Sequence, residues 1–391
     1  MDTEAARVQS PRILIDVTPL QSEHRMRGVG TYVFNLTYEL VKLHPESLEF
    51  LASTVERSHI DEMLTPVHWG YRPHKPAQVY WLYNEIFLRK SLSHIQPTLF
   101  HATDFNGVPE KSRIPVIATL YDLTSLTVSG GDRSLSHQLS EWRWHTYFFR
   151  KLPQVDHVIA ISEHAKTQAC ETLGMNPAKI TVIPLGVNSN RYTAAEKGHG
   201  VYANTPPYLL YVGSADANKN LARLIDGFEL VANGWKDVQL WLAGKWAPET
   251  MNVIQSVISA KHLENQVRML GFVPTKDLPS LYANALAFVF PSLSEGFGLP
   301  IIEAMSSGIP VIASDIPIFR EVADDAAVLV DPRDPAAWAK ALESLLASQD
   351  TRIRLRDVGL KHSKRFHWDK VAQETWGVYE EVLRSKTRQE G

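Results

Sequence analysis

Two glutamates lie on either side of a glycine-bearing loop, and their side chains are suited to binding a polar ligand. Glu295 and Glu303 are separated by seven residues, and the loop between them begins with Gly296-Phe297-Gly298. Because glycine has no Cβ, the backbone of such a loop can approach a ligand closely. A carboxylate accepts hydrogen bonds and is therefore suited to hydroxyl groups such as those of a sugar or a ribose.

The surrounding sequence, residues 290–314, predicts the elements that would position these carboxylates. It predicts the end of a strand, the glycine loop, a helix and a second strand. Pro300 is suited to the first turn of a helix, which places Glu303 within that turn. Gly308 is expected to end the helix before Pro310 opens the next strand. A helix N-terminus favours an anion, so a ligand with both phosphate and hydroxyl groups would satisfy the whole segment.

A simpler interpretation of the two glutamates stays open. Glu303 would then only complement the helix dipole, and Glu295 would be a solvated surface side chain. The order of strand, loop and helix over the full run of residues 290–314 favours the ligand site over this interpretation.

A lysine in the second half of the chain is the cation that could stabilise such a ligand. Residues 207–213 predict a strand, and residues 214–220 lead from it into a helix with the sequence LARLIDGFELV. Lys219 therefore lies near a helix N-terminus, where a cation opposes the helix dipole. A bound diphosphate would compensate for this, and a solvated lysine is the alternative. Further strands are predicted at residues 238–244, 267–273, 286–292 and 326–332.

The first half of the chain predicts strands that alternate with helices. An apolar run at residues 12–17 predicts a buried strand, and a loop with Gly28 and Gly30 leads from it into the helix VFNLTYELVKL. The pattern GxG alone is a weak sign of a nucleotide site, because glycines also simply turn the chain. Further strands are predicted at residues 48–54, 98–102, 115–120, 156–162 and 180–184, and a helix at residues 79–94.

Several polar side chains are predicted at the carboxyl ends of these strands. The residues concerned are His101, Tyr121, Asp122 and Ser162. Ligands of a parallel sheet bind beyond the carboxyl ends of its strands, so we expect these residues to face one crevice. A hydrogen-bonded structural histidine stays open as the alternative for His101.

These motifs resemble those of a known family, the retaining glycosyltransferases of the GT-B fold of the family-4 type. The signature of that family has two glutamates separated by seven residues with a GFGLP-like loop between them, and residues 295–303 are similar to it. In the first half, HxTxF at 101–105, VIAISEHAK at 158–166 and KITVIPLGVN at 179–188 are similar to family motifs. The resemblance covers nearly the whole chain, and its motifs are more specific in the second half.

The resemblance implies a role for each matching residue. In the family the first glutamate reaches the transferred sugar and the second binds the ribose, which by position would be Glu295 and Glu303. The loop at Gly28 would lie over the phosphates or the sugar of the donor, and the segment after the strand at 267–273 would meet the nucleobase. The implied catalytic residues are Glu295, Lys219, Tyr121 and His101, and the implied donor-binding residues are Gly28, Gly30, Ser214, Lys219, Val273, Gly296, Phe297, Gly298, Leu299 and Glu303.

The chain departs from the family pattern at Tyr121. Many relatives have a histidine at this position, before Asp-Leu, and that histidine is often assigned to the sugar or to the reaction centre. A tyrosine can form hydrogen bonds but does not titrate near neutral pH. We favour a positioning role for Tyr121, with His101 as the alternative participant.

A second departure concerns the cations. Asn218 precedes Lys219 where relatives commonly carry an arginine. Lys219 would then provide most of the stabilisation of the leaving diphosphate. Arg27 or Arg223 from nearby segments could assist it.

The predicted fold class is α/β, with two Rossmann-like doubly wound domains that face a cleft in the GT-B arrangement. At 391 residues the chain exceeds the size of one ordinary core. Residues 1–190 are expected to form the acceptor-binding domain, residues 191–206 a polar linker, and residues 207–370 the domain that binds the nucleotide sugar. The resemblance implies that residues 371–391 form a helix that returns to the first domain.

Composition argues against several other classes of protein. The formal net charge of −3, with mixed signs, argues against a nucleic-acid binder. The single cysteine, Cys170, rules out an internal disulfide framework and fits a reducing compartment. No stretch approaches the roughly 20 apolar residues of a membrane span, and the polar N-terminal sequence is unlike a signal peptide. We therefore expect a cytoplasmic protein, and attachment to the inner face of the cell membrane stays open.

One segment, residues 133–151, could contact a membrane surface. It mixes the aromatic residues Trp142, Trp144, Tyr147, Phe148 and Phe149 with the basic residues Arg133, Arg143, Arg150 and Lys151. A helix of this composition could lie on an anionic bilayer. A helix with its aromatic residues in a domain core is the alternative. The lipid-linked acceptors of many family members favour the membrane interpretation.

The predicted function is a retaining, metal-independent transfer of a hexose from a nucleotide-diphospho-sugar to a lipid-linked polysaccharide intermediate. The sequence has no two aspartates separated by one residue and no zinc-like His/Cys spacing, so no cofactor or metal is expected. Lys219 and the amides of residues 296–298 would meet the departing charge. Family frequency favours a UDP-glucose-like or GDP-mannose-like donor. A sugar-nucleotide epimerase of the same fold and a non-catalytic nucleotide-sugar-binding protein are the alternatives.

Overall fold

A computed structural model describes residues 11–21, 28–53, 64, 66–70, 84–123, 146–147, 149–193 and 198–390. Contacts between Cα atoms divide the chain into two compact units. The described residues up to Pro184 and those from Trp368 onward form the first unit, and residues 185–367 form the second. The first unit is therefore discontinuous in sequence, whereas the described part of the second is not interrupted by it.

The first unit is built on a parallel sheet with the strand order β3-β2-β1-β4-β5-β6-β7. The strands are β1 Ile13–Asp16, β2 Leu48–Ser53, β3 Val67–Gly70, β4 Leu99–Ala102, β5 Val116–Leu120, β6 His157–Ala160 and β7 Ile180–Val182. All residues of β1, β4, β5 and β6 are buried, as expected for strands covered on both faces. The strand order reverses between β1 and β4, which is where doubly wound sheets bind their ligands.

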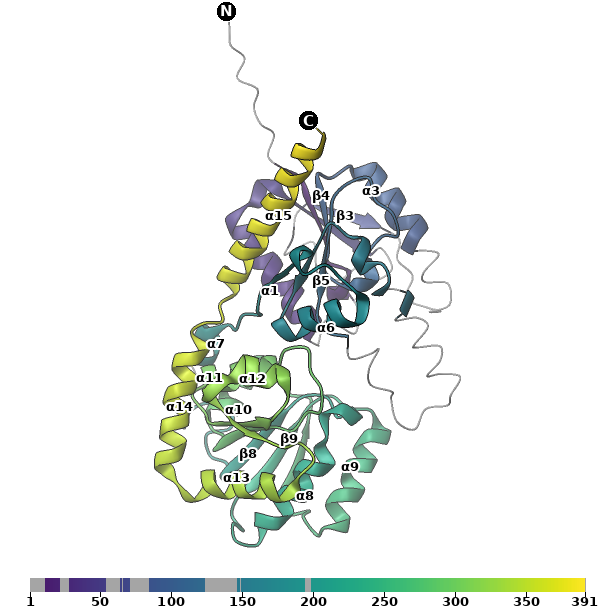
Figure 1. The fold of residues 1–391 in the computed structure, drawn as a ribbon. Helices are drawn as coiled ribbons and strands as arrows, with labels where there is room; N and C mark the ends of the chain where they lie inside the picture. Colours follow the sequence, from purple (N-terminus) through teal and green to yellow (C-terminus); the bar gives the residue numbers. More distant parts are fainter. Residues whose placement is uncertain are drawn as a thin grey trace, which may run out of the picture. The chain divides into compact units, whose positions relative to one another are not determined.

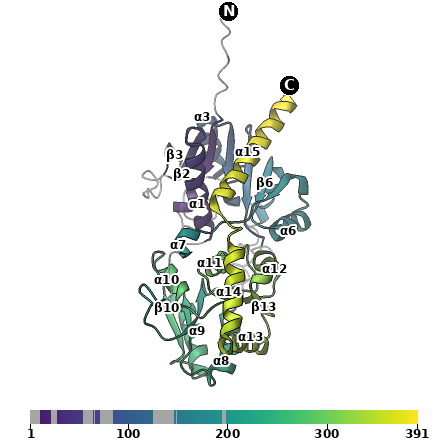
Figure 2. The same ribbon diagram turned by 90° about the vertical axis from the view of Figure 1, so that its left-hand side faces the viewer.

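Helices cover this sheet in the first unit (Figure 1). They are α1 Gly28–Leu43, α3 Arg89–Ile95, α6 Glu163–Leu173 and α15 Trp368–Glu390. Short 3₁₀ helices lie at Thr18–Gln21, Pro45–Ser47, Phe105–Gly107, Leu152–Gln154 and Pro177–Lys179, and a π-helical turn at Asn84–Leu88 precedes α3. The two helices α1 and α15 pack side by side although they lie far apart in the sequence (Figures 1 and 2). The predicted cap of α6 is confirmed, because the Ser162 hydroxyl accepts a 3.0 Å hydrogen bond from the Ala165 amide.

The second unit repeats this plan with a second parallel sheet, whose strand order is β10-β9-β8-β11-β12-β13. The strands are β8 Tyr208–Val212, β9 Gln239–Ala243, β10 Val267–Gly271, β11 Ala287–Phe290, β12 Val311–Ser314 and β13 Val328–Val330. The helices are α7 Ser189–Thr193, α8 Leu221–Ala232, α9 Pro248–Ala260, α10 Leu278–Ala283, α11 Leu299–Ser306, α12 Pro317–Ala323, α13 Pro335–Ala347 and α14 Gln349–Ser363, with 3₁₀ helices at Ala217–Lys219 and Asp324–Ala326. Helix α8 packs against α13, and α11 packs against α14.

The predicted α/β fold class is confirmed by these two sheets. The predicted strands at 12–17, 48–54, 98–102, 115–120, 156–162, 180–184, 207–213, 238–244, 267–273, 286–292 and 326–332 correspond to β1, β2, β4, β5, β6, β7, β8, β9, β10, β11 and β13. The sequence does not predict β3, which is a four-residue edge strand and has only two apolar residues. Of the predicted helix at 79–94, residues 79–83 lie outside the described residues, and the rest forms the π-helical turn and most of α3.

The predicted glycine loop in the first unit is wrong. Helix α1 begins at Gly28 and not at Val33, so Gly28 and Gly30 belong to its first turn. The conformational freedom of glycine destabilises mainly the middle of a helix, so glycine is tolerated near the end. Gly28 is exposed, whereas the backbone of Gly30 is buried.

The expected linker at residues 191–206 is part of the second unit. Its first residues complete α7, and later ones are held by hydrogen bonds from the Gly198 amide to Asn284 Oδ1 (2.7 Å) and from the Tyr202 amide to Ser280 Oγ (3.4 Å). Polar sequences rich in Gly and Pro form surface turns as readily as linkers, so composition does not separate the two. The division falls after residue 184 and after residue 367, and α15 belongs to the first unit.

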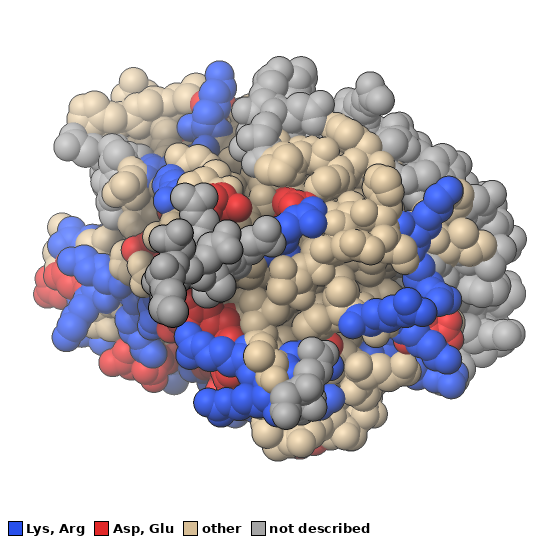
Figure 3. Space-filling view, turned by 90° about the horizontal axis from the view of Figure 1, so that it is seen from above, with Lys and Arg blue, Asp and Glu red and all other residues tan. Residues whose placement is uncertain are grey.

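The described surface carries charges of both signs. On the face shown in Figure 3, Lys and Arg side chains lie among Asp and Glu side chains, in line with the net charge of −3. No helix within the described ranges is long and apolar enough to cross a membrane. Residues 133–145 and 148 lie outside the described residues, so a membrane contact through them stays a prediction. Phe149 and Lys151 of the same segment are buried in the first unit, as the alternative of a core helix expects.

Candidate functional site

Two of the predicted residues are in direct contact at the carboxyl edge of the second sheet. Lys219 ends the 3₁₀ helix that follows β8, and Glu295 lies in the loop between β11 and α11. Lys219 Nζ is 2.5 Å from Glu295 Oε1, and the two side chains are only 15% and 14% exposed. An ion pair so little exposed requires firm positioning, because both charges lose much of their hydration.

Hydrogen bonds between neighbouring loops position this pair. The Leu293 amide donates to the carbonyl of Asn218 at 2.7 Å. Asn220 adopts the left-handed conformation (φ 57°), which asparagine tolerates better than most residues. Its side chain donates to the carbonyls of Pro291 (3.2 Å) and Pro332 (2.7 Å). Asn220 therefore joins the loop after β8 to the loops after β11 and β13, and this fixes the backbone on both sides of the ion pair.

The immediate surroundings of the pair leave the lysine with hydrogen-bonding capacity. Ser292 Oγ donates to Glu295 Oε1 at 2.7 Å, which orients the carboxylate. The Lys219 ammonium lies 5.8 Å from the centre of the Phe290 ring. An ammonium has three N–H donors, and the ion pair uses one of them. The carboxylate of Glu295 also compensates for the positive charge of Lys219 near the N-terminus of α8, where a cation is otherwise unfavourable. Lys219 is therefore not the solvated lysine of the alternative interpretation.

Glycines let the backbone come close at this edge. Gly298 precedes α11 with φ 103°, and a Cβ there would lie 2.9 Å from a ring carbon of Phe319. Gly213 follows β8 and Gly244 follows β9. A Cβ on Gly244 would lie 1.9 Å from the carbonyl oxygen of Gly213, which also accepts a hydrogen bond from Trp246 Nε1 at 2.9 Å. The ends of β8 and β9 can therefore meet only if residue 244 is glycine.

The other predicted donor-binding residues of this unit contribute mainly to structure. Phe297 is buried and packs edge-to-face on Phe366, so its side chain belongs to the core. The Ser214 hydroxyl donates to Asp216 at 2.8 Å. Val273 is also buried. Gly296 and Leu299 are half-buried beside Glu295, so their backbone stays the candidate for contact with a ligand.

Glu303 lies in the second turn of α11 and not in its first turn as the sequence predicts, because the helix begins at Leu299. The Tyr282 hydroxyl donates to Glu303 Oε2 at 3.1 Å, and Tyr192 also hydrogen-bonds to this carboxyl. The two tyrosine rings pack edge-to-face with their centres 5.7 Å apart. Burial raises the pKa of Glu303 to about 7, although both hydrogen bonds and the charge of Arg191 oppose the shift. Glu303 is therefore held by tyrosines of the same unit.

The raised pKa of Glu303 predicts a dependence of stability on pH. The pKa is about 7 in the folded protein and 4.5 as the reference value, so the folded state holds the proton more tightly. Its stabilising effect is complete below the unfolded pKa and is lost as the pH rises through about 7. We expect the free energy of unfolding of the wild type to fall by up to about 3 kcal/mol between pH 5 and pH 8, relative to that of Glu303→Gln. Urea unfolding measures both proteins. A constant difference between the two proteins over this range would contradict the assignment.

His101 lies in the interior of the first unit. Its side chain is fully buried, with Nδ1 2.6 Å from Tyr379 Oη and Nε2 2.9 Å from Thr119 Oγ1. Desolvation lowers the pKa of His101 to about 3, so the ring is neutral. Thr119 also lies 3.1 Å from Tyr32 Oη. Both ring nitrogens are occupied within this buried network, and the geometry corresponds to the structural alternative for His101.

Tyr121 also serves the packing of the first unit. Its hydroxyl donates to the Thr103 carbonyl at 2.8 Å, and its ring packs edge-to-face on Tyr32 with centres 5.5 Å apart. Burial raises the pKa of Tyr121 well above its usual value, so the phenol is neutral. Its ring is only half-buried, which is compatible with the predicted positioning role. Arg27 lies outside the described residues, and Arg223 pairs with Asp226 at 2.9 Å instead of with a residue of the site.

The sequence did not identify four residues that position the predicted ones. They are Ser292, Asn220, Tyr192 and Tyr282. Only Ser292 has a local signal, since a serine three residues before Glu295 can reach it within the same loop. The other three act on groups that are distant in sequence, so no spacing rule points to them.

One cluster of potential metal ligands lies elsewhere in the second unit. In the part of the chain that the structure describes, Asp324, Asp325 and His362 place ligand atoms within 4.8 Å of one another. The two aspartates are exposed and precede β13, at the opposite edge of the sheet from Lys219 and Glu295. His362 Nε2 donates to the Val322 carbonyl at 2.8 Å. The cluster is therefore no part of the candidate site.

Comparison with known sequences supports the predicted family. Residues 26–191 match the family described as Glycosyltransferase Family 4, and residues 195–362 match the family described as Glycosyl transferases group 1. The phosphatidyl-myo-inositol mannosyltransferase of Mycobacterium leprae is 31% identical over 280 residues, which cover 70% of this chain and 69% of that protein. The O-antigen chain mannosyltransferase B of Escherichia coli is 33% identical over 186 residues, which cover 44% of this chain and 45% of that protein. A second O-antigen relative, from Salmonella typhimurium, is matched over 57% of its length, so the chain spans about half of these two O-antigen relatives.

Comparison with solved structures supports the fold. A sucrose-phosphate synthase from Thermosynechococcus elongatus superposes with a TM-score of 0.76 at 19% identity, over 96% of this chain and all of that chain. The Anabaena protein HepE, solved with UDP and glucose, superposes with a TM-score of 0.73 at 18% identity, over 95% of this chain and 99% of that chain. With two parallel-sheet units, the paired glutamate motif and these relatives, the chain belongs to the GT-B glycosyltransferases of family 4 and group 1.

Proposed function

We propose that this protein is a retaining hexosyltransferase. It would move a hexose from a nucleotide-diphospho-sugar to a hydroxyl group of a glycan or lipid-linked glycan. The observation that carries the proposal is the little-exposed pair of Lys219 and Glu295 at the carboxyl edge of the second sheet. The names of two relatives, both mannosyltransferases, favour mannose as the transferred sugar. A UDP- or GDP-linked hexose is the proposed donor.

Lys219 is proposed to stabilise the leaving nucleoside diphosphate. As the bond between the sugar and the diphosphate breaks, negative charge builds up on the departing phosphate. The ammonium of Lys219 and the amides of residues 296–298 are proposed to meet this charge, and preorganised groups need little reorganisation during the reaction. The diphosphate would replace the carboxylate of Glu295 as the main partner of the lysine.

Glu295 is proposed to hold hydroxyl groups of the transferred sugar. Once the diphosphate has engaged Lys219, the carboxylate can accept hydrogen bonds from the sugar and stabilise positive charge at the anomeric carbon. Ser292 keeps the carboxylate oriented through its 2.7 Å hydrogen bond. Glu295 is not proposed as a nucleophile. Glu303, which lies in α11, is proposed to bind the ribose of the donor.

The proposal also covers the acceptor, the cofactor and the location of the protein. The first unit is proposed to bind the acceptor, because Lys219 and Glu295 both belong to the second unit. No metal or other cofactor is part of the proposed reaction, since Lys219 supplies the required positive charge. A cytoplasmic location, with contact between residues 133–145 and the inner face of the membrane, is proposed because it fits a lipid-linked acceptor.

The proposal is tested by Glu295→Gln in a transfer assay with UDP-glucose, GDP-mannose and a lipid-linked oligosaccharide, in the presence and absence of EDTA. We expect the variant to lose about 10- to 100-fold in kcat, because it removes charge from a group that acts in the transition state. Glu264→Gln, at an exposed position of the same unit, is the matched control and should keep full activity. EDTA should have no effect.

Two results would support a different function. An isomerised sugar nucleotide formed from the donor alone would indicate an epimerase. Binding of the donor without turnover in the presence of any acceptor would indicate a non-catalytic binding protein. Equal activity of Glu295→Gln and the wild type would show that the charge of Glu295 takes no part in the reaction.

A further inference from the structure

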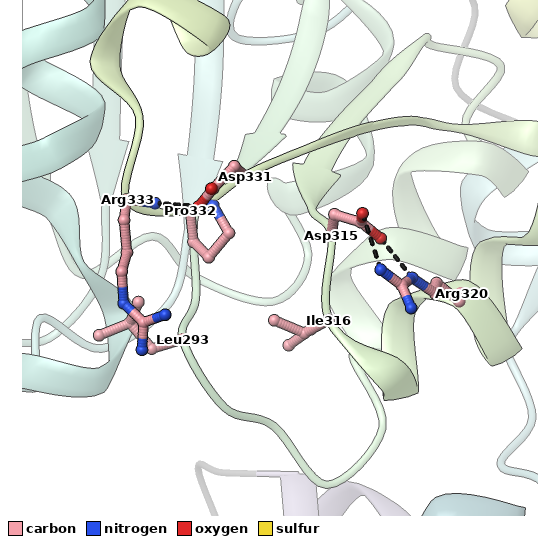
Figure 4. A pocket seen from close by; sticks show the side chains of 7 residues that line it. All are labelled: Leu293, Asp315, Ile316, Arg320, Asp331, Pro332 and Arg333. Carbon is pink, nitrogen blue, oxygen red and sulfur yellow. Dashed lines mark hydrogen bonds and ion pairs between the residues drawn. The ribbon is translucent and has the colours of Figure 1, made fainter.

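A polar hollow of about 310 Å³ lies at the carboxyl ends of β11, β12 and β13 in the second unit. Its lining residues are Leu293, Asp315, Ile316, Arg320, Asp331, Pro332 and Arg333. Figure 4 shows Leu293 and Arg333 on one side of the hollow and the paired Asp315 and Arg320 on the other. The volume lies at the lower end of the roughly 300–1,000 Å³ of small-molecule sites. The hollow can therefore take a ligand the size of one or two sugar rings.

One wall of the hollow is a preorganised ion pair. Arg320 Nε donates to Asp315 Oδ1 at 2.5 Å, and Arg320 Nη2 donates to Asp315 Oδ2 at 2.9 Å. The hydrogen bonds from Arg320 lower the pKa of Asp315, so the carboxylate is ionised. A two-point pair of this kind fixes the orientation of the guanidinium relative to the carboxylate. Each carboxylate oxygen keeps a lone pair and the guanidinium keeps unused N–H groups, so the pair can still both donate and accept.

The opposite wall provides an unused donor and an apolar surface. The guanidinium of Arg333 forms no hydrogen bond or ion pair with any residue in the described ranges, although its backbone amide donates to Asp331 Oδ1 at 2.8 Å. Leu293 is 39% exposed, so its apolar side chain is accessible at the hollow. Ile316 and Pro332, which also line the hollow, are buried. The hollow thus combines paired polar groups with apolar lining residues.

We propose that this hollow is a glycan-binding site that holds a neutral pyranose ring. A pyranose has hydroxyl groups around its rim, which both donate and accept, and an apolar C–H surface on its faces. The Asp315–Arg320 pair and Arg333 match the rim, and Leu293 matches a face. The bound ring is a sugar other than the one that Glu295 contacts, and the proposal does not depend on the transfer reaction.

The charge of the lining favours a neutral sugar over an anion or a cation. Two arginines, Arg320 and Arg333, are balanced by two aspartates, Asp315 and Asp331, so the site has no net charge to attract a phosphate. A metal ion is disfavoured because one carboxylate is already held by a guanidinium. The hollow also shares the loop of Leu293 with Glu295, two residues further along, and Asn220 binds the carbonyl of Pro332. A glycan bound here would therefore lie next to the loops that carry the proposed transfer site.

The test uses saturation-transfer NMR on the full chain with methyl α-mannopyranoside and methyl α-glucopyranoside, and inorganic phosphate as a competitor. We expect one or both glycosides to bind, and Arg333→Ala to weaken binding by at least about tenfold. Arg333→Ala should keep the stability of the wild type, because the guanidinium has no partner to lose. Arg354→Ala, an exposed arginine on α14, is the matched control and should bind like the wild type.

Further binding experiments distinguish ligand binding in this hollow from ligand binding at the proposed donor site. Lys219→Ala should keep glycoside binding and lose the thermal shift produced by nucleoside diphosphates, so the two proposals can fail independently. Additive binding of glycoside and sugar nucleotide is expected, because the proposed ring is not the sugar that Glu295 contacts, and competition between the two would contradict the proposal. Absence of glycoside binding, unchanged binding in Arg333→Ala, or displacement by phosphate would each overturn the proposal.

Discussion

Replacing Lys219 with alanine should lower kcat for sugar transfer by about 100- to 1,000-fold, which is the usual cost of removing one preorganised group that stabilises transition-state charge. Lys219 Nζ is held 2.5 Å from Glu295 by loops that Asn220 joins, so a departing phosphate would meet a cation already in place. Asn218, which precedes Lys219, carries no charge, and Arg223 is engaged with Asp226. Neither of these two residues therefore offers a substitute for the charge of Lys219.

The assay measures initial rates with saturating donor, and unfolding curves accompany every variant. Lys236→Ala, an exposed lysine of the same unit, is the matched control and should keep the wild-type rate. Lys219→Ala leaves the carboxylate of Glu295 unpaired, so some loss of stability is expected in the single variant. The double variant Lys219→Ala/Glu295→Gln should recover part of that stability and none of the activity. If Lys219→Ala and Glu295→Ala both left transfer unchanged, the transferase site would lie elsewhere.

Replacing Gly244 with alanine should destabilise the second unit by about 3–5 kcal/mol or prevent it from folding. The new Cβ would lie 1.9 Å from the carbonyl oxygen of Gly213 and 2.4 Å from Trp246 Nε1. Neither strand can move away cheaply, because the Gly213 amide bonds to the Ala243 carbonyl and the Gly244 amide bonds to the Gly271 carbonyl, both at 2.9 Å. The clash is with backbone, which cannot change rotamer to relieve it.

Urea unfolding followed by tryptophan fluorescence measures this effect. Gly377→Ala is the matched control, because Gly377 lies within α15 and a Cβ there would meet nothing within 4 Å. This control should stabilise the first unit by about 0.5–1 kcal/mol, since alanine favours a helix over glycine. An unfolding midpoint of Gly244→Ala close to that of the wild type would show that β8 and β9 can separate at this edge.

The sequence predicts the fold well because each sheet strand is a short apolar run bounded by turns. The strands β1 and β5 are buried at every position, so their sequences contain no polar face that could confuse them with surface strands. The same reasoning fails for β3, where half of the residues are polar or glycine. It also fails at α1, because glycines, which usually mark a loop, here occupy the first turn of a helix.

The candidate site is predicted only in part from the sequence. Lys219 and Glu295 are recognisable because each follows a strand that ends at the same edge of a parallel sheet. Their contact depends on β8 and β11 being neighbours in the sheet, which is a property of the strand order. His101 has the same kind of position in sequence, yet Tyr379 covers its Nδ1 from a helix that is 278 residues away. The position of a residue at a strand end therefore gives no information on what later elements place over it.

The hydrogen bond between His101 and Tyr379 has a consequence for the order in which the protein is completed. The chain is synthesised from its N-terminus, so β1 to β7 are made first, yet they lack α15 until the residues of the second unit have followed. During that interval the Nδ1 of His101 has no partner from α15, and the hydrogen bond to Tyr379 adds its net contribution of about 0.5–1.5 kcal/mol only when α15 docks. The second unit contains all of its own strands and can close its core earlier. The part of the molecule that is synthesised first is therefore the part that reaches its final packing last.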